Sequence, residues 1–174
     1  AITKLSHIHF PDSESAKQRI IRMGEDPKNV YMFGSLDTEF AMDVEKYPIL
    51  PKPYVVVLYH PQPNDREIQK SLWQRLQAMP QKKVYIKSNS DYGQQIGTEE
   101  YSPEDFIRLV WNADMLIGNS SAMYKEAYVL KTPTVVIGDR QQGREKVGYI
   151  PNTAKNIANV LQTATVPFQK HFYE

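Results

Sequence analysis

The stretch MLIGNSSAMYKEAYVLKTPTVVIGDRQQGR, residues 115–144, decides the fold of this chain. A short apolar segment ends at Ile117 and leads into the polar turn Gly118-Asn119-Ser120-Ser121. A second apolar segment, residues 134–137, leads into a turn rich in Arg and Gln, and we expect a helix between the two segments. Strands that end in hydroxylated and cationic residues can hold an anion such as a diphosphate.

The chain before and after this stretch repeats the alternation of strands and helices. We expect strands at residues 54–59, 84–86, 115–117 and 134–137, and helices at residues 64–79, 102–112, 121–130 and 154–163. The continuous apolar run at residues 54–59 suits a strand that is covered on both faces. The pattern therefore predicts an α/β fold with a doubly wound parallel sheet, Rossmann-like in kind.

The first part of the chain is predicted to be a separate region. We expect a strand at residues 4–10, a helix from Asp12 or Ser13 to Met23, a second strand at residues 30–33 and a short further helix. Residues 47–53 contain three prolines, which forbid a helix and favour a stiff connector. We therefore divide the chain into residues 1–46, a Pro-rich hinge at 47–53, and a domain at 54–174.

Composition narrows the classes of function. The chain has 174 residues, of which 41% are hydrophobic and 24% charged, with a net charge of +1. These values are typical of a globular domain and give no sign of a nucleic-acid or membrane partner. The chain has no cysteine, which excludes disulfides and thiolate metal sites and is compatible with the cytoplasm, where we expect the protein.

Polar side chains follow each predicted strand of the sheet, namely His60, Asn89, Ser120 and Arg140. In an open parallel sheet, ligands bind outside the carboxyl ends of the strands. We therefore expect these four residues to share one rim. No dinucleotide fingerprint, phosphate loop or nucleophile elbow is found.

Each candidate residue also has an ordinary structural explanation. Ser120 and Ser121 together exceed the single serine that a helix cap needs. Glu126, placed to accept hydrogen bonds from a ribose, is otherwise a solvated helix glutamate. His7 and His9 share a strand face, but no third metal ligand accompanies them, so we expect interior or interface histidines and no metal or cofactor.

These motifs resemble those of the hydrolysing UDP-N-acetylglucosamine 2-epimerases, which form N-acetylmannosamine and UDP in sialic acid biosynthesis. The resemblance rests on Gly118-Asn119-Ser120-Ser121 with Glu126, and on Gly138-Asp139-Arg140-Gln141 with Gly143-Arg144. Tyr59-His60-Pro61 and the opening residues 2–10 are similar in the same order. The Asp-Arg-Gln turn separates this group from its non-hydrolysing relatives.

The resemblance implies a glycosyltransferase-B architecture in which this chain is the C-terminal, UDP-binding half, preceded by the last elements of the N-terminal half. It implies that Ser120, Ser121 and Arg140 contact the diphosphate, Glu126 the ribose, and Asn89 the nucleotide. It also makes His60 the catalytic residue that helps UDP depart. The partners implied are UDP or UDP-N-acetylglucosamine and the missing N-terminal half, while a homo-oligomer stays open.

The chain departs from the family at three points. The carboxylates that move protons in this family belong to the N-terminal half, so we expect the chain alone to be inactive. Met123 stands where the family usually has Gly beside the diphosphate, and the effect of this bulky side chain on ligand binding stays open. Residues 166–174 replace a Gly-rich segment and helix. The alternatives are an epimerase of a related UDP-diacetamido sugar and a non-catalytic nucleotide-sugar binding module.

Overall fold

The computed structural model of the chain describes residues 2–88, 97–166 and 170, and it forms two compact units. The first unit consists of Ala1–Phe40 and Val147–Glu174, and the second of Ala41–Lys146. The α-helices are α1 (Ile2–Leu5), α2 (Glu14–Arg22), α3 (Leu36–Asp43), α4 (Arg66–Ala78), α5 (Pro103–Asn112), α6 (Glu126–Val129) and α7 (Thr153–Thr163). The 3₁₀ helices are η1 (Pro27–Asn29) and η2 (Ser121–Met123), and the strands are β1 (Tyr54–Leu58), β2 (Lys82–Tyr85), β3 (Met115–Gly118) and β4 (Thr134–Val136).

The four strands form one parallel sheet in the second unit, in the order β2-β1-β3-β4. From β1 the chain passes through α4 to β2 on one side, and it then crosses to build β3 and β4 on the other side. The direction of winding therefore reverses between β1 and β3. Such a reversal opens a crevice at the carboxyl ends of the strands.

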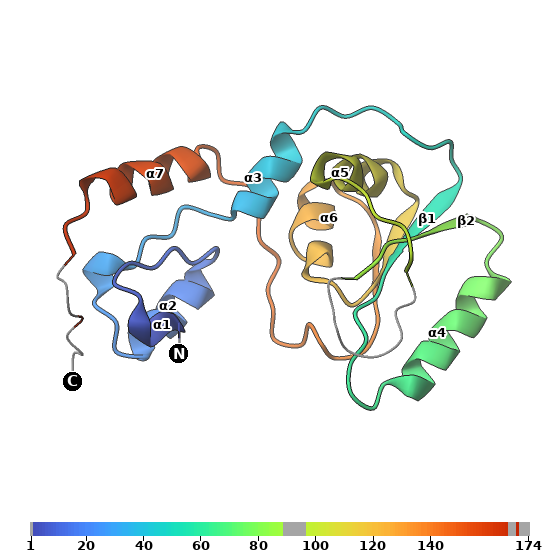
Figure 1. Cartoon of the computed structure of the whole chain (residues 1–174), viewed down its shortest axis with the longest axis horizontal. Helices are drawn as coiled ribbons and strands as arrows, with labels where there is room; N and C mark the ends of the chain where they lie inside the picture. Colours follow the sequence, from blue (N-terminus) through green and yellow to red (C-terminus); the bar gives the residue numbers. More distant parts are fainter. Residues whose placement is uncertain (1, 89–96, 167–169, 171–174) are drawn as a thin grey trace. The chain divides into compact units, whose positions relative to one another are not determined.

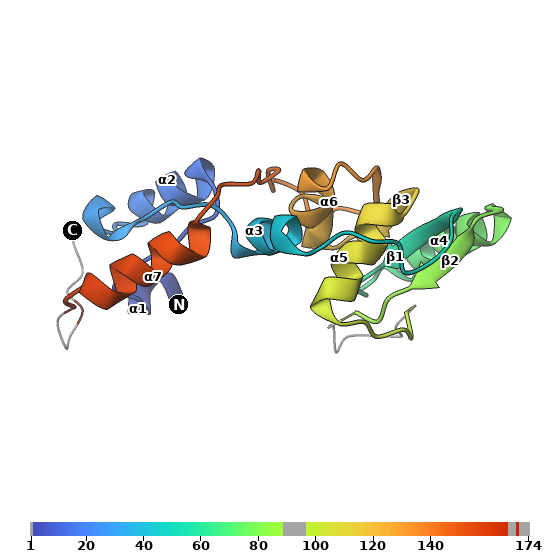
Figure 2. The ribbon, with the colours of Figure 1, turned by 90° about the horizontal axis from the view of Figure 1, so that it is seen from above.

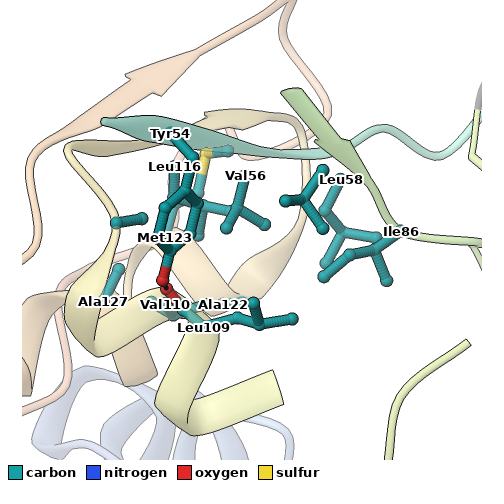
Figure 3. Close-up of a cluster of buried hydrophobic side chains, with 12 residues drawn as sticks. Tyr54, Val56, Leu58, Ile86, Leu109, Val110, Leu116, Ala122, Met123 and Ala127 are labelled. Carbon is teal, nitrogen blue, oxygen red and sulfur yellow. Dashed lines mark hydrogen bonds between the residues drawn. The ribbon is translucent and has the colours of Figure 1, made fainter. Parts of the chain in front are cut away.

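Helices cover both faces of this sheet, as the sequence predicted. All five residues of β1 are buried, and alternate side chains enter two separate cores. One core, under α5 and α6, contains Tyr54, Val56, Leu58, Val84, Ile86, Leu109, Val110, Ala113, Leu116, Ala122, Met123 and Ala127 (Figure 3). The other, under α4, contains Val55, Val57, Tyr59, Leu72, Leu76 and Ile117. The two groups of helices can be followed in Figure 1 and, from above, in Figure 2.

Two local features of the sequence fix the start of α5 and the close pairing of β3 with β1. Ser102 caps α5, its hydroxyl accepting a hydrogen bond from the Asp105 amide at 3.1 Å, and Pro103 occupies the first turn. Gly118 ends β3 with φ +148°, and a Cβ there would stand 1.9 Å from the Leu58 carbonyl oxygen. Only glycine permits this close approach of β3 to β1.

In the described part of the first unit the helices are accompanied by a bridge between His9 and Val30 and not by a sheet. Glu39 accepts hydrogen bonds from the amides of Thr153 and Ala154, at 2.8 and 2.7 Å, and so caps α7. The buried Glu25 carboxylate receives His9 Nε2 at 3.1 Å and Lys170 Nζ at 2.6 Å. Burial alone would raise the pKa of Glu25, but the hydrogen bonds from Lys170, His9 and Lys4 lower it.

Some expected elements differ from the structure. The strands expected at residues 4–10 and 30–33 are both wrong, because residues 2–5 form α1 and the two segments share only the bridge between His9 and Val30. The alternating pattern lacked neighbouring strands to pair with, and a two-residue bridge does not propagate. The last helix, α7, groups with the first unit rather than with the domain at 54–174. The division at 47–53 remains a prediction.

Candidate functional site

A cavity of about 580 Å³ opens at the carboxyl ends of β1, β2 and β3. It lies entirely within the second unit. Its lining consists of Leu58, His60, Ile86, Lys87, Ser88, Glu99, Glu100, Tyr101, Pro103, Phe106, Ser120, Ser121, Ala122 and Glu126. Four residues that the sequence analysis singled out therefore share this cavity: His60, Ser120, Ser121 and Glu126.

The two serines follow β3 at the wall of the cavity. Ser120 is buried and caps η2, its hydroxyl oxygen accepting a hydrogen bond from the Ala122 amide at 3.3 Å. The helix expected at residues 121–130 is interrupted, since η2 ends at Met123 and α6 begins only at Glu126. A 3₁₀ turn of three residues has a smaller dipole than a full helix. The hydroxyls and nearby N–H groups, rather than a helix dipole, are therefore the groups that this turn offers to a ligand.

His60 lies at the end of β1 and is half-buried at the cavity. Burial, and then the positive charge of Arg140, lower the pKa of its imidazole below the ordinary value of 6.5. The ring is therefore neutral at pH 7, so that one nitrogen donates a hydrogen bond and the other accepts one.

A single buried residue, Asn119, joins the ends of three strands. Its side-chain oxygen accepts a hydrogen bond from the His60 amide at 2.7 Å, and its side-chain nitrogen donates to the His60 carbonyl at 2.8 Å. Its own carbonyl accepts from Arg140 Nη1 at 2.9 Å and from Gln141 Nε2 at 2.7 Å. Asn119 is fully buried and Gln141 nearly so. The loops after β1, β3 and β4 therefore converge on one residue.

The remaining candidates stand differently. Arg140 is held against the Asn119 carbonyl but is exposed and does not belong to the cavity lining. Asn89 lies outside the described residues. Met123 does not belong to the cavity lining, and its side chain is buried in the core next to Tyr54 and Leu116 (Figure 3).

Sequence reasoning expected a polar rim after β2 and chose Asn89 there, but it did not single out Ser88, Glu99 or Tyr101, which line the cavity on that side. Ser88 is buried there, and among the described residues its hydroxyl has no hydrogen-bond partner. Lys87 pairs with Glu100, and the Tyr101 hydroxyl donates to Glu99 at 2.5 Å. Burial and the Glu99 carboxylate raise the pKa of Tyr101 to about 12. The only signal in the sequence was a polar run after a predicted strand, which is common in loops.

Two classes of site receive no support from the structure. Across residues 2–88, 97–166 and 170, no group of three or more His, Asp or Glu side chains could hold a metal ion. Within the same residues, no helix combines the length and the apolar character that crossing a membrane requires.

The comparisons with known proteins identify the family. The family model for UDP-N-acetylglucosamine 2-epimerase matches residues 1–171. The chain belongs to this family. It is 33% identical to the polysialic acid biosynthesis protein P7 of Escherichia coli, over 83% of this chain and 44% of that protein. It is 32% identical to the hydrolysing UDP-N,N'-diacetylbacillosamine 2-epimerase of Legionella pneumophila, over 84% of this chain and 46% of that protein.

Solved structures agree on the fold. The Staphylococcus aureus MnaA–UDP structure matches 94% of this chain and 52% of its own with a TM-score of 0.60, at 17% identity. The UDP-N-acetylglucosamine 2-epimerase of Rickettsia bellii matches 95% of this chain and 53% of its own with a TM-score of 0.59, at 18% identity. The chain thus spans about half the length of the relatives and structures that it matches.

Proposed function

We propose that this chain is the UDP-binding half of a hydrolysing UDP-N-acetylglucosamine 2-epimerase of sialic acid biosynthesis. The complete reaction converts UDP-N-acetylglucosamine and water to N-acetylmannosamine and UDP. The observation that carries this proposal is the cavity at the switch point of the sheet, where His60, Ser120, Ser121 and Glu126 meet within one unit. The family match and a polysialic acid biosynthesis protein among the relatives support it.

The chemistry of the cavity suits the parts of UDP. The hydroxyls of Ser120 and Ser121 donate to the diphosphate, with Arg140 approaching from the outer side of the rim. Glu126 accepts hydrogen bonds from the ribose diol. The apolar and aromatic side, formed by Ile86 and Phe106, offers a surface on which a uracil ring packs. The contact of Asn89 with the nucleotide, which the family resemblance implies, falls outside the described residues.

In this proposal His60 assists the departure of UDP. Elimination of UDP from the sugar leaves negative charge on the diphosphate, and donors already held at that position lower the barrier. His60 is neutral before the ligand binds, and its ring N–H donates to the leaving oxygen. As negative charge gathers there the imidazolium becomes more favourable, so His60 can take up a proton and pass it on. The elimination also removes the C2 proton, which a base of the N-terminal half takes up. Water then adds across the C1–C2 double bond of the intermediate, with its hydroxyl going to C1 and a proton to the opposite face of C2.

Calorimetry with UDP, UMP and uridine tests the binding site. We expect UDP to bind more tightly than UMP and UMP more tightly than uridine, because the diphosphate makes most of the charged contacts. Ser120→Ala should weaken UDP binding by about 1–3 kcal/mol, as for the loss of a hydrogen bond to a charged group.

Ser13→Ala is the matched control, since Ser13 also caps a helix with its hydroxyl but belongs to the first unit. It should leave UDP binding unchanged. Equal affinity for all three ligands, or no binding at millimolar UDP, would remove the diphosphate site.

A second candidate substrate is a UDP-diacetamido sugar. It is favoured by the 32% identity to the Legionella pneumophila enzyme named for UDP-N,N'-diacetylbacillosamine, against 28% to the UDP-N-acetylglucosamine 2-epimerase of Neisseria meningitidis. Comparing the two UDP-sugars in the same binding experiment separates these candidates. A third possibility, a non-catalytic nucleotide-sugar binding module, loses one of its arguments, since Met123 lies in the core.

A further inference from the structure

We propose that Asn119 is a positioning residue that couples His60 to Arg140 across the rim of the sheet. Asn119 touches neither residue's functional tip through its side chain. Its side-chain amide instead holds the backbone of His60 from both sides, and its backbone carbonyl, whose position depends on that side chain, anchors the Arg140 guanidinium. The expected effect on UDP binding rests on the proposed function. The coupling between His60 and Arg140 does not depend on it.

The side chain of Asn119 continues the hydrogen-bond ladder between β1 and β3 beyond the point where the two backbones pair. The last register pair of the two strands is Leu58 with Gly118. The backbone N–H of Asn119 then donates to the Leu58 carbonyl at 3.3 Å. Beyond this point the backbones no longer pair as strands. The primary amide of Asn119 has the donor and the acceptor of a peptide group, and it supplies both to His60. Neither a hydroxyl nor a carboxylate offers that combination with the same reach.

The same residue sets the position of the positive charge. Two donors, from Arg140 and Gln141, share the Asn119 carbonyl. Arg140 is otherwise exposed, and its hydrogen bond to the Asn119 backbone carbonyl ties its guanidinium to the rim. A shift of Asn119 therefore moves the His60 backbone and the Arg140 guanidinium together. Buried polar groups with all partners in place stabilise one arrangement, and loss of one partner leaves the others unsatisfied.

The coupling can be measured without any ligand. Burial lowers the pKa of the His60 imidazole, and the positive charge of Arg140 lowers it further. In the wild-type chain, Arg140→Gln should therefore raise the pKa of His60, followed by NMR titration of the ring signals. His60→Ala identifies which of the four histidines gives those signals.

We expect the effect of Arg140→Gln on the pKa of His60 to fall to less than half in an Asn119→Ala background. In an Asn112→Ala background it should persist in full. Asn112 is the matched control, because its side-chain nitrogen also donates to a backbone carbonyl, that of Leu50 at 3.1 Å, at a place outside the cavity lining. An undiminished effect in the Asn119→Ala background would overturn the proposal.

If Asn119→Ala does not fold, as judged by circular dichroism, Asn119→Asp takes its place in the same comparison. The carboxylate fills nearly the same volume and keeps the acceptor for the His60 amide, but it cannot donate to the His60 carbonyl. The proposal again requires a reduced effect of Arg140→Gln, and an undiminished effect again refutes it.

Binding of UDP provides a second measurement. Asn119→Ala, or Asn119→Asp in its place, should weaken UDP binding about tenfold or more, and Asn112→Ala should leave it unchanged. Wild-type UDP affinity in the Asn119 variant would contradict the positioning role. Failure of the wild-type chain to bind UDP would instead overturn the proposed function, and the NMR comparison would still decide the coupling.

Discussion

At the scale of single residues, the surroundings of His60 decide its chemistry more than the residue type does. An exposed histidine is partly protonated near neutral pH, whereas burial and Arg140 keep this one neutral. A neutral ring donates and accepts, which suits a group that meets an anionic leaving group. The sequence alone identified His60 from its place after a strand, but it gave no information about this shift.

The pH dependence of UDP binding follows from the lowered pKa of His60. A bound diphosphate places negative charge near the ring and raises the pKa of His60. At a pH between the pKa of His60 in the free chain and its pKa in the bound chain, binding of UDP is therefore accompanied by uptake of a proton. The affinity for UDP should therefore rise as the pH falls through that interval, by up to about tenfold per pH unit. Calorimetry between pH 8 and pH 5.5 measures it.

The terminal phosphate of UDP also titrates, near pH 6 as phosphate esters do. His60→Gln, which keeps a donor but does not titrate, is the control for that contribution. The two proteins should differ in the slope of affinity against pH. Parallel slopes would show that His60 does not sense the ligand.

At the scale of elements, the sequence predicted a helix or strand correctly where the signal depended on neighbouring residues alone. The cap at Ser102 and the apolar run of β1 predicted their elements because each needs only its own neighbours. The strand at residues 4–10 failed because its alternation required partners that the described chain does not provide. The hydrogen bonds of Asn119 could not be predicted from local sequence either. They join Asn119 to His60, which is 59 positions away, and to Gln141, which is 22 positions away.

The rim requires glycine at position 118. Gly118→Ala should destabilise the second unit by about 2–4 kcal/mol, because φ +148° is strained for alanine and the new Cβ would meet the Leu58 carbonyl. Urea denaturation measures the loss. Gly148→Ala is the control, since its Cβ would have no atom within 4 Å, and it should change stability by no more than about 0.5 kcal/mol. Equal effects of the two substitutions would contradict the close approach of β3 to β1.

The first unit depends on the buried carboxylate of Glu25. Because its pKa is lowered from the ordinary 4.5, Glu25 stabilises the folded state above that pH and loses this contribution as the pH falls through the folded-state pKa. Glu25→Gln should cost about 1.5–3 kcal/mol at pH 7, as for hydrogen bonds to a charged group. In urea denaturation the difference from wild type should shrink toward pH 3. Glu14→Gln, which alters an exposed pair with Gln18, should cost little at either pH.

At the scale of the whole molecule, the chain is about half as long as its relatives, and the described cavity belongs to one unit only. The sequence predicted the sheet, its winding and the side of the sheet where polar residues gather. It did not predict that α7 groups with the first unit, because the apolar face of a helix does not say which surface covers it. Substrate choice and turnover belong to the complete protein, and we treat both as proposals.

The last prediction is that this chain alone does not turn over UDP-N-acetylglucosamine at a useful rate. Proton removal at C2 needs a positioned base, which typically contributes about 10²–10⁴-fold. The cavity does contain carboxylates besides Glu126, but Glu99 accepts the Tyr101 hydroxyl, and Glu100 pairs with Lys87, which lowers its pKa and makes it a weaker base. We assign Glu126 to the ribose. His60 helps only the leaving group, which stabilises one part of the transition state.

Release of UDP from UDP-N-acetylglucosamine by the purified chain measures this prediction, with and without a separately expressed N-terminal half of a related epimerase. We expect no release above background from the chain alone, even though it binds UDP, and release when the second half supplies its carboxylates. Glu99→Gln and His60→Ala distinguish the explanations if the chain is active. Robust release that Glu99→Gln abolishes would identify Glu99 as the base, and release that only His60→Ala abolishes would give His60 both roles. Either result would show that one half of the architecture suffices for the chemistry.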